Sequence, residues 1–270
     1  MAEKTIVLVT GGNTGIGYES VKALYASSEP HIVLMGSRSL SKAHDAIQQL
    51  QSEVTETKSE VVPMQIDIED DASIEKLHKD IESKYGKLDV LVNNAGGSHD
   101  GVMYKNPTAA GLREAFDHTY SLNVTSTHVL THTLAPLIIK SSRPRILFVT
   151  SGLSSLELCA KDNHPNMPAF PGVGMPKPPV SSQIAYRSSK VGLNMLMLEW
   201  VRLLKKDGVK VFCISPGFLA TNLAGLGPEK LRQMGAGEPS LGGKIIKEVV
   251  EGERDDDAGK VVKTGGVQSW

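Results

Sequence analysis

The chain has 270 residues, enough for one large α/β domain or two smaller domains. Hydrophobic residues make up 40% and charged residues 22%, a composition typical of a globular protein with a sizeable core. With 29 basic and 30 acidic side chains, the formal net charge of −1 gives no electrostatic basis for binding nucleic acid or an anionic membrane. Two cysteines, Cys159 and Cys213, are too few for a disulfide framework and indicate a reducing compartment.

We expect neither a targeting segment nor a membrane anchor. Its first residues, Met-Ala-Glu-Lys, lead directly into the apolar run Ile6–Val9, without the charged-then-apolar pattern of a cleavable leader. No apolar stretch approaches the ~20 residues that a membrane-spanning helix needs. We therefore expect a cytoplasmic protein with no membrane partner.

Short apolar runs alternate with longer segments of helical periodicity. The predicted strands are Thr5–Val9, His31–Met35, Val61–Ile66, Val90–Val92, Arg145–Val149 and Val209–Ile214, with a weak seventh near Lys260–Val262. Stretches such as Ser41–Val54 and Ala72–Tyr85 have apolar residues on one helical stripe. Continuous apolar strands separated by helices indicate a parallel sheet buried on both faces. The sequence thus predicts an α/β fold: a single doubly wound Rossmann domain over residues 1–270, with a parallel six- to seven-stranded sheet and helices on both faces.

One segment interrupts this alternation. Residues 153–182 contain six of the 14 prolines and lack a clear helical or strand pattern. A polar, proline-rich stretch of this length inside a compact domain is usually functional or disordered. We interpret it as an insertion beside the site.

A glycine-rich turn follows the first predicted strand and precedes a helix. Glycines there let the backbone amides approach a pyrophosphate at the N-terminus of the helix. The spacing is Gly-x3-Gly-x-Gly, unlike the common Gly-x-Gly-x-x-Gly fingerprint. The predicted phosphate-binding residues are Gly11, Asn13, Thr14, Gly15, Ile16 and Gly17.

The end of the second strand indicates which dinucleotide binds. NAD enzymes usually carry Asp or Glu there to bind the ribose 2′-hydroxyl, whereas this chain has Ser37-Arg38. A hydroxyl followed by a guanidinium accepts a 2′-phosphate through charge-assisted hydrogen bonds. Ser37 and Arg38 therefore predict NADP(H) as the cofactor.

Tyr186 and Lys190 are the candidate acid–base pair. Their spacing of i and i+4 places them on one face of a helix, where an ammonium group favours the phenolate form of the tyrosine. The pair alone is common on helix surfaces. Ser151, however, directly follows the predicted strand Arg145–Val149 and its neighbour Thr150, at the carboxyl edge where open α/β sheets bind ligands. Its hydroxyl could hold a substrate carbonyl oxygen.

The spacing of the histidines does not predict a metal site. His128 and His132 have i, i+4 spacing, but no third ligand follows at a suitable distance along the chain. We expect no bound metal.

These motifs, in this order, resemble the short-chain dehydrogenase/reductase family, and the resemblance extends over most of the chain. The length of the segment between Ser151 and Tyr186 is similar to that of the NADPH-dependent carbonyl-reductase branch. This chain departs from the family pattern at Thr14, where NADP-specific members often carry a basic residue. The resemblance assigns Asn123 to a proton relay that reaches the lysine. It also implies further cofactor contacts from Asp67, Ile68, Asn94, Ala95, Gly96, Tyr186, Lys190, Pro216, Gly217 and Thr221.

The resemblance implies an enzyme that transfers hydride between NADPH and a ketone or aldehyde carbonyl, reversibly with an alcohol. The alternative is a catalytically weak NADP(H)-binding regulator on the same fold, which the complete set of Asn123, Ser151, Tyr186 and Lys190 disfavours. A nucleotide-sugar epimerase would need more chain after Pro216-Gly217. We expect a small-molecule substrate. Residues 153–182 would cover the helices through which relatives assemble and so favour a monomer, although a surface loop with no bearing on assembly is nearly as well supported.

Overall fold

The computed structural model describes residues 4–161, 173–175, 183–223 and 225–270. Its eight strands are β1 (Thr5–Val9), β2 (His31–Ser37), β3 (Glu60–Gln65), β4 (Val90–Asn93), β5 (Arg145–Val149), β6 (Lys210–Ser215), β7 (Val261–Lys263) and β8 (Gly266–Gln268). The longer helices are α1 (Gly15–Tyr25), α2 (Leu40–Glu53), α3 (Asp71–Tyr85), α5 (Ala109–Tyr120), α6 (Thr127–Ile138), α8 (Ile184–Leu203) and α10 (Ser240–Val250). Shorter helices are α4 (Asp100–Lys105), α7 (Leu156–Ala160) and α9 (Pro228–Gln233), and single turns occupy Ser121–Ser126, Gly152–Ser154, Lys205–Asp207 and Asp255–Asp257.

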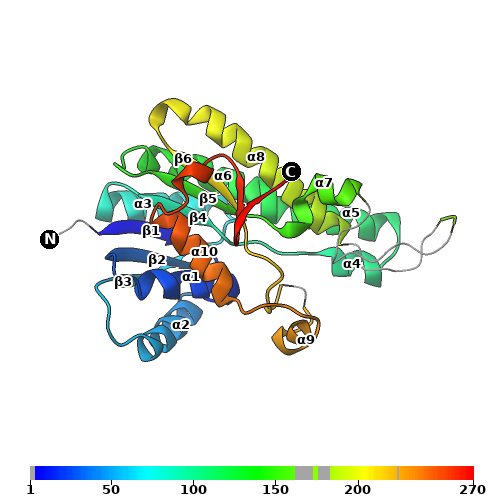
Figure 1. The fold of residues 1–270 in the computed structure, drawn as a ribbon, viewed down its shortest axis with the longest axis horizontal. Helices are drawn as coiled ribbons and strands as arrows, with labels where there is room; N and C mark the ends of the chain where they lie inside the picture. The colour runs from blue at the N-terminus through cyan, green and yellow to red at the C-terminus, as the bar shows by residue number, and fades with distance from the viewer. Residues whose placement is uncertain (1–3, 162–172, 176–182, 224) are drawn as a thin grey trace.

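The strands form one sheet in the order β3-β2-β1-β4-β5-β6-β7-β8, and the first seven run parallel (Figure 1). Successive side chains of β1 enter different layers, since Ile6 and Leu8 pack on one face while Val7 and Val9 pack on the other. Helices α3, α6 and α8 cover the first face, and α1, α2 and α10 cover the second. The predicted doubly wound Rossmann fold is confirmed.

The sheet has one strand more than the predicted six to seven. Strand β8 pairs antiparallel with β7, with Val262 opposite Val267. The chain reverses through Gly265 and Gly266, which both adopt positive φ angles of 75° and 153°. A three-residue strand is too short to produce an alternation that sequence periodicity can detect.

The order of the strands places the site. Successive connections leave β1 in one direction toward β2 and β3, and later connections move in the other direction from β4 to β7. The connections after β1 and β4 therefore leave in opposite directions, and the carboxyl ends of two such strands are the usual ligand position in open α/β sheets. Among the described residues, no helix combines the length and the apolar character needed to cross a membrane.

Most of the proline-rich segment at 153–182 lies outside the described residues. Its first part forms a single helical turn at Gly152–Ser154 and the short helix α7. Val173 and Met175 are exposed.

Candidate active site

The glycine turn between β1 and α1 is held by the end of β4. The side-chain amide of Asn94 donates hydrogen bonds to the carbonyl oxygens of Thr10 and Gly11, at 2.8 and 3.3 Å. The hydroxyl oxygen of Thr10 accepts hydrogen bonds from the backbone amides of Asn94 and Ala95, at 3.0 and 2.9 Å. A Cβ atom at Gly17 would lie only 2.1 Å from the carbonyl oxygen of Gly11. The turn thus requires glycine at this position because the backbone of α1 passes directly beneath it.

This turn has the features of an anion-binding site. Helix α1 begins at Gly15, and the first amides of any helix have no partner within the helix. The side chain of the preceding residue, Thr14, does not cap them. Ile16 lies in this first turn, and Asn13 is partly exposed just before it. The unpaired amides and the helix dipole favour a negatively charged ligand, such as a pyrophosphate.

Strand β2 extends two residues beyond its predicted end and includes Ser37. The Ser37 side chain is 4% exposed, and its hydroxyl donates a hydrogen bond to the Ser39 carbonyl at 3.0 Å. Arg38 is exposed, and its guanidinium makes no hydrogen bond or ion pair within the part of the chain that the structure describes. All five guanidinium N–H donors therefore remain available to a ligand.

The neighbouring strand ends supply the remaining predicted cofactor residues. Asp67 and Ile68 follow β3; the Asp67 carboxylate accepts a hydrogen bond from the Glu69 amide at 3.1 Å, and Ile68 is buried. Pro216 and Gly217 follow β6, and Gly217 has a φ angle of 100°. The loop then returns to the glycine turn, where a Cβ at Gly15 would lie 3.7 Å from the Thr221 methyl group. The structure therefore brings residues from five strand ends to one edge of the sheet.

Helix α8 carries Tyr186 and Lys190 beneath the carboxyl end of β5. The two side chains are 6% and 5% exposed, and the Lys190 ammonium lies 5.7 Å from the centre of the Tyr186 ring. Lys190 donates a hydrogen bond to the Val149 carbonyl oxygen at 2.8 Å, at the last residue of β5. Ser151 lies two residues further along, and its side chain is hydrogen-bonded to that of Tyr186. Three separate elements of the sequence thus meet as one cluster.

Burial shifts the pKa values of both titratable groups. It raises the pKa of Tyr186 to about 12; the hydrogen bond with Ser151 opposes this shift, and the negative charge of Asp100 adds to it. Burial also lowers the pKa of Lys190 to about 8. At neutral pH the tyrosine is therefore protonated, while the lysine still carries its charge.

Asn123 holds the loop after β4 against α8. It lies in the single π-helical turn Ser121–Ser126, an irregularity frequent at functional sites. Its side-chain amide donates to the Gly97 carbonyl at 2.8 Å and to the Ser189 hydroxyl at 3.0 Å, and its oxygen accepts from the Gly97 amide at 2.9 Å. A Cβ at Gly96 would lie 2.8 Å from that oxygen and 3.4 Å from the Lys190 nitrogen. Only glycine at position 96 leaves room for this contact.

The structure adds polar residues that the sequence did not single out. Ser154 accepts hydrogen bonds from Thr150, Asn194 and Gln268, at 3.2, 3.0 and 3.2 Å. Gln268, on β8, also donates to the Ser151 carbonyl at 3.2 Å. Asp100 caps the start of α8. None of these residues belongs to a local sequence pattern, because each has at least one hydrogen-bond partner 40 or more positions away along the chain.

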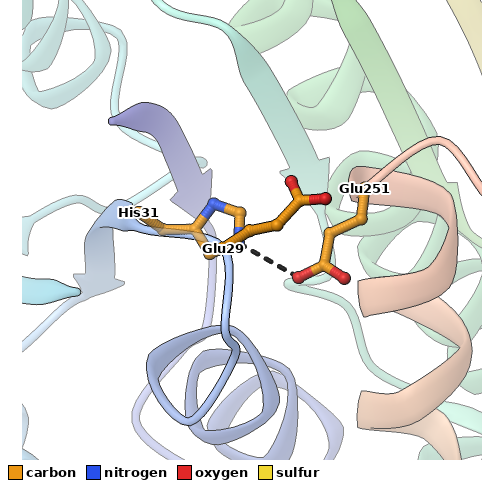
Figure 2. A group of neighbouring side chains, drawn as sticks. All are labelled: Glu29, His31 and Glu251. Carbon is orange, nitrogen blue, oxygen red and sulfur yellow. Dashed lines mark hydrogen bonds and ion pairs between the residues drawn. The ribbon is translucent and has the colours of Figure 1, made fainter. Parts of the chain in front are cut away.

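A potential metal-ligating cluster lies at the opposite edge of the sheet, at the start of β2 (Figure 2). Glu29, His31 and Glu251 place one ligand atom each within 4.8 Å of one another. The Glu251 carboxylate, however, already accepts hydrogen bonds from Lys247 at 2.6 Å, Ser27 at 2.6 Å and His31 at 3.1 Å. Because the Lys247 ammonium neutralises this carboxylate, the cluster serves to join β2 to α10.

A doubly wound sheet with a glycine turn and a Ser-Tyr-Lys cluster at its carboxyl edge defines a dinucleotide-dependent oxidoreductase. The chain belongs to the short-chain dehydrogenase/reductase family, whose short chain dehydrogenase model matches residues 5–160 and 174–230. It is 42% identical to the short-chain dehydrogenase/reductase tropE of Talaromyces stipitatus, over 100% of this chain and 99% of that protein. It is also 42% identical to the short-chain dehydrogenase/reductase eupG of a Phoma species, over 99% and 98%.

A solved structure shares the fold. The NADPH-bound carbonyl reductase from chicken fatty liver aligns with a TM-score of 0.77 over 100% of both chains, at 22% sequence identity. Two proteins so different in sequence have the same arrangement of strands and helices.

Proposed function

We propose that this protein is an NADP(H)-dependent reductase of ketone or aldehyde carbonyls, able to oxidise the corresponding alcohols in reverse. The observation that carries the proposal is the meeting of Ser151, Tyr186 and Lys190 at the same sheet edge as the glycine turn. Such a site needs a small-molecule substrate with one reducible oxygen. The substrate would enter over the edge formed by the loops after β4, β5 and β6.

The residues at this edge fit a bound NADP(H). The backbone of the turn from Gly11 to Gly17 would hold the pyrophosphate, and Asn94-Ala95-Gly96 would line the next part of the cleft. Ser37 and the unpaired Arg38 guanidinium would bind the 2′-phosphate. Asp67 with Ile68 would contact the adenine, and Pro216, Gly217 and Thr221 the nicotinamide carboxamide. When bound, the cofactor supplies the hydride.

The protein's own side chains supply the proton and the charge stabilisation. Ser151 and Tyr186 would both donate hydrogen bonds to the substrate oxygen. Tyr186 is protonated at neutral pH, since its pKa is raised to about 12, and so would act as the general acid in the reductive direction. The charge of Lys190 would stabilise the phenolate that remains. Asn123 would keep the loop at Gly96-Gly97 and the helix carrying Lys190 in register.

Cofactor choice tests the first half of the proposal. We expect kcat/KM to favour NADPH over NADH by roughly 10- to 100-fold, the effect of one or two hydrogen bonds to a charged phosphate. The double substitution Ser37→Asp with Arg38→Leu should reverse this preference. Equal use of both cofactors by the unaltered protein would refute the 2′-phosphate assignment.

Replacing Tyr186 by phenylalanine tests the second half. The ring remains but the proton is lost, so turnover with a carbonyl panel should fall by ~10²–10⁴ while NADPH binding persists. Tyr85→Phe, at the last residue of α3 on the same face of the sheet as α8, is the matched control and should be neutral. If the unaltered protein binds NADPH but reduces no carbonyl in the panel, it is the regulator rather than the enzyme.

A further inference from the structure

Helix α8, which carries Tyr186 and Lys190, has no cap of its own. Its preceding residue, Gln183, has a φ angle of 48° and makes no side-chain hydrogen bond to the first turn. The first amides of a helix lack partners within the helix and must find them elsewhere when they are buried. Here the partner comes from α4, on a different part of the chain.

Asp100, the first residue of α4, supplies that partner. Its Oδ1 accepts a hydrogen bond from the Ala185 amide at 2.9 Å, and its Oδ2 accepts one from the Tyr186 amide at 3.0 Å. The Ser98 hydroxyl donates a third hydrogen bond to Oδ2 at 2.8 Å. The side chain is 2% exposed. All three contacts are donors, which is the environment of a carboxylate, and the positive end of the α8 dipole adds to its stability.

We propose that Asp100 is a positioning residue of the reaction, whose carboxylate fixes the first turn of α8 and thereby holds Tyr186 beside Ser151. This inference rests on the proposed function. The contact is made to the backbone of the tyrosine itself, so a loosened cap would displace the phenol directly. Asp100 also follows Gly96-Gly97 closely in the chain, so it couples the loop after β4 to the catalytic helix.

The charge of Asp100 acts on the same tyrosine. Among the described residues, the groups that bear on the Tyr186 phenol are the Ser151 hydroxyl, which lowers its pKa, and the Asp100 carboxylate, which raises it in addition to burial. The Lys190 ammonium lies 5.7 Å from the ring. Arg187, on the same helix, is engaged with the Leu153 carbonyl at 3.4 Å. Removing the carboxylate should therefore make Tyr186 more acidic, an effect that a purely structural cap would not produce.

Asp100→Asn is the test variant because it keeps the volume and one acceptor but removes the charge. The matched control is Asp70→Asn, at the N-cap of α3, where the carboxylate accepts the Ala72 amide at 3.0 Å and so caps a helix that carries neither Tyr186 nor Lys190. We expect Asp100→Asn to lower kcat about tenfold, to leave the NADPH dissociation constant within twofold, and to move the alkaline limb of the kcat profile to lower pH. Tyrosinate absorbance, compared with and without the added Tyr186→Phe change, should show the same shift. Asp70→Asn should do none of this.

An unchanged kcat and alkaline limb in Asp100→Asn would overturn the inference, and so would a loss of kcat with no shift of the limb. If Tyr186→Phe retains full activity, the proposed function fails. If Tyr186→Phe loses activity but Asp100→Asn keeps the kcat and pH profile of the unaltered protein, only the role of Asp100 fails. If Asp100→Asn does not fold, amide hydrogen exchange in the unaltered protein still tests the cap. The amides of Ala185 and Tyr186 should exchange slowly with solvent, unlike those of an ordinary first helical turn, and fast exchange would reject the cap.

Discussion

Replacing Lys190 by methionine should stabilise the protein free of cofactor while it abolishes turnover. The Lys190 side chain is buried on all sides, and burial lowers its pKa to about 8 from an ordinary 10.5. At pH 7 the folded protein must keep a charged ammonium in this environment, whereas the unfolded chain exposes it to water. The difference between the two pKa values corresponds to about 3 kcal/mol of lost folding free energy.

Methionine has a similar length and no charge, so it should recover most of that free energy. It cannot donate the 2.8 Å hydrogen bond to the Val149 carbonyl, and this loss costs about 1 kcal/mol. The net gain is then about 2 kcal/mol at pH 7. For a chain of this size that gain corresponds to roughly 4–8 °C in Tm.

The gain should depend on pH in a defined window. Below pH 8 both folded and unfolded states carry the proton on Lys190, and the penalty is present in full. Between pH 8 and 10.5 the unfolded chain binds a proton that the folded protein does not, so the free energy of unfolding of the unaltered protein rises with pH. The advantage of Lys190→Met should therefore shrink across this window and turn into a deficit of about 1 kcal/mol above it, where only the lost hydrogen bond to Val149 remains.

Urea unfolding of both proteins at pH 7 and at several pH values up to 10.5 measures this difference. Burial also raises the pKa of Tyr186, which titrates in both proteins. It raises the pKa of Cys213 too, and there the charge of Lys190 opposes the shift, so the comparison measures the lysine together with its coupling to Cys213. Lys244→Met, at an exposed site on α10, is the control and should change stability by less than about 0.5 kcal/mol. A Lys190→Met protein less stable than the unaltered one at pH 7, or an advantage that persists at pH 10.5, would refute the reasoning.

Three further changes have defined expectations. Gly17→Ala places a Cβ against the backbone of the glycine turn and should cost about 1–3 kcal/mol of stability with a parallel loss of NADPH affinity in fluorescence titration, whereas Gly208→Ala, in open space, should leave affinity unchanged. Gln268→Ala removes the donor to the Ser151 carbonyl, so kcat should fall roughly 2- to 10-fold in steady-state assays with the KM for NADPH unaltered. Burial acts to raise the pKa of Glu251, but hydrogen bonds from Lys247, Ser27 and His31 outweigh it, so the pKa is lowered in the folded protein. The ionised carboxylate therefore stabilises the fold above pH 4.5, and this stabilisation is lost as the pH falls further. Glu251→Gln should lower the free energy of unfolding at pH 7 by about 1–3 kcal/mol. It should also weaken the fall of Tm at acidic pH, and an unchanged dependence of Tm on pH would contradict this.

The sequence by itself determined the strands that form the centre of the sheet. Continuous apolar runs such as Thr5–Val9 and Arg145–Val149 are buried on both faces, and burial on both faces leaves a local signal that needs no knowledge of the partner strands. The glycine turn after β1 and the Tyr186–Lys190 pair are local for the same reason, because each depends on spacing within a few residues. The cofactor role of Ser37-Arg38 was predicted from their place at the end of the second strand, which needs no knowledge of tertiary contacts.

Tertiary structure alone decided what surrounds these residues. Asp100, Ser154 and Gln268 act through hydrogen bonds to segments distant along the chain, and such pairings leave no periodic trace in the sequence. The pKa values of Tyr186 and Lys190 likewise depend on burial by several elements at once. Strand β8 was missed because three residues and a glycine reversal carry too little pattern, although its Gln268 donates a hydrogen bond to the carbonyl of Ser151. Local spacing indicates the candidate reacting groups, whereas long-range packing sets their positions and their protonation, because only folding brings the desolvating and charged neighbours together.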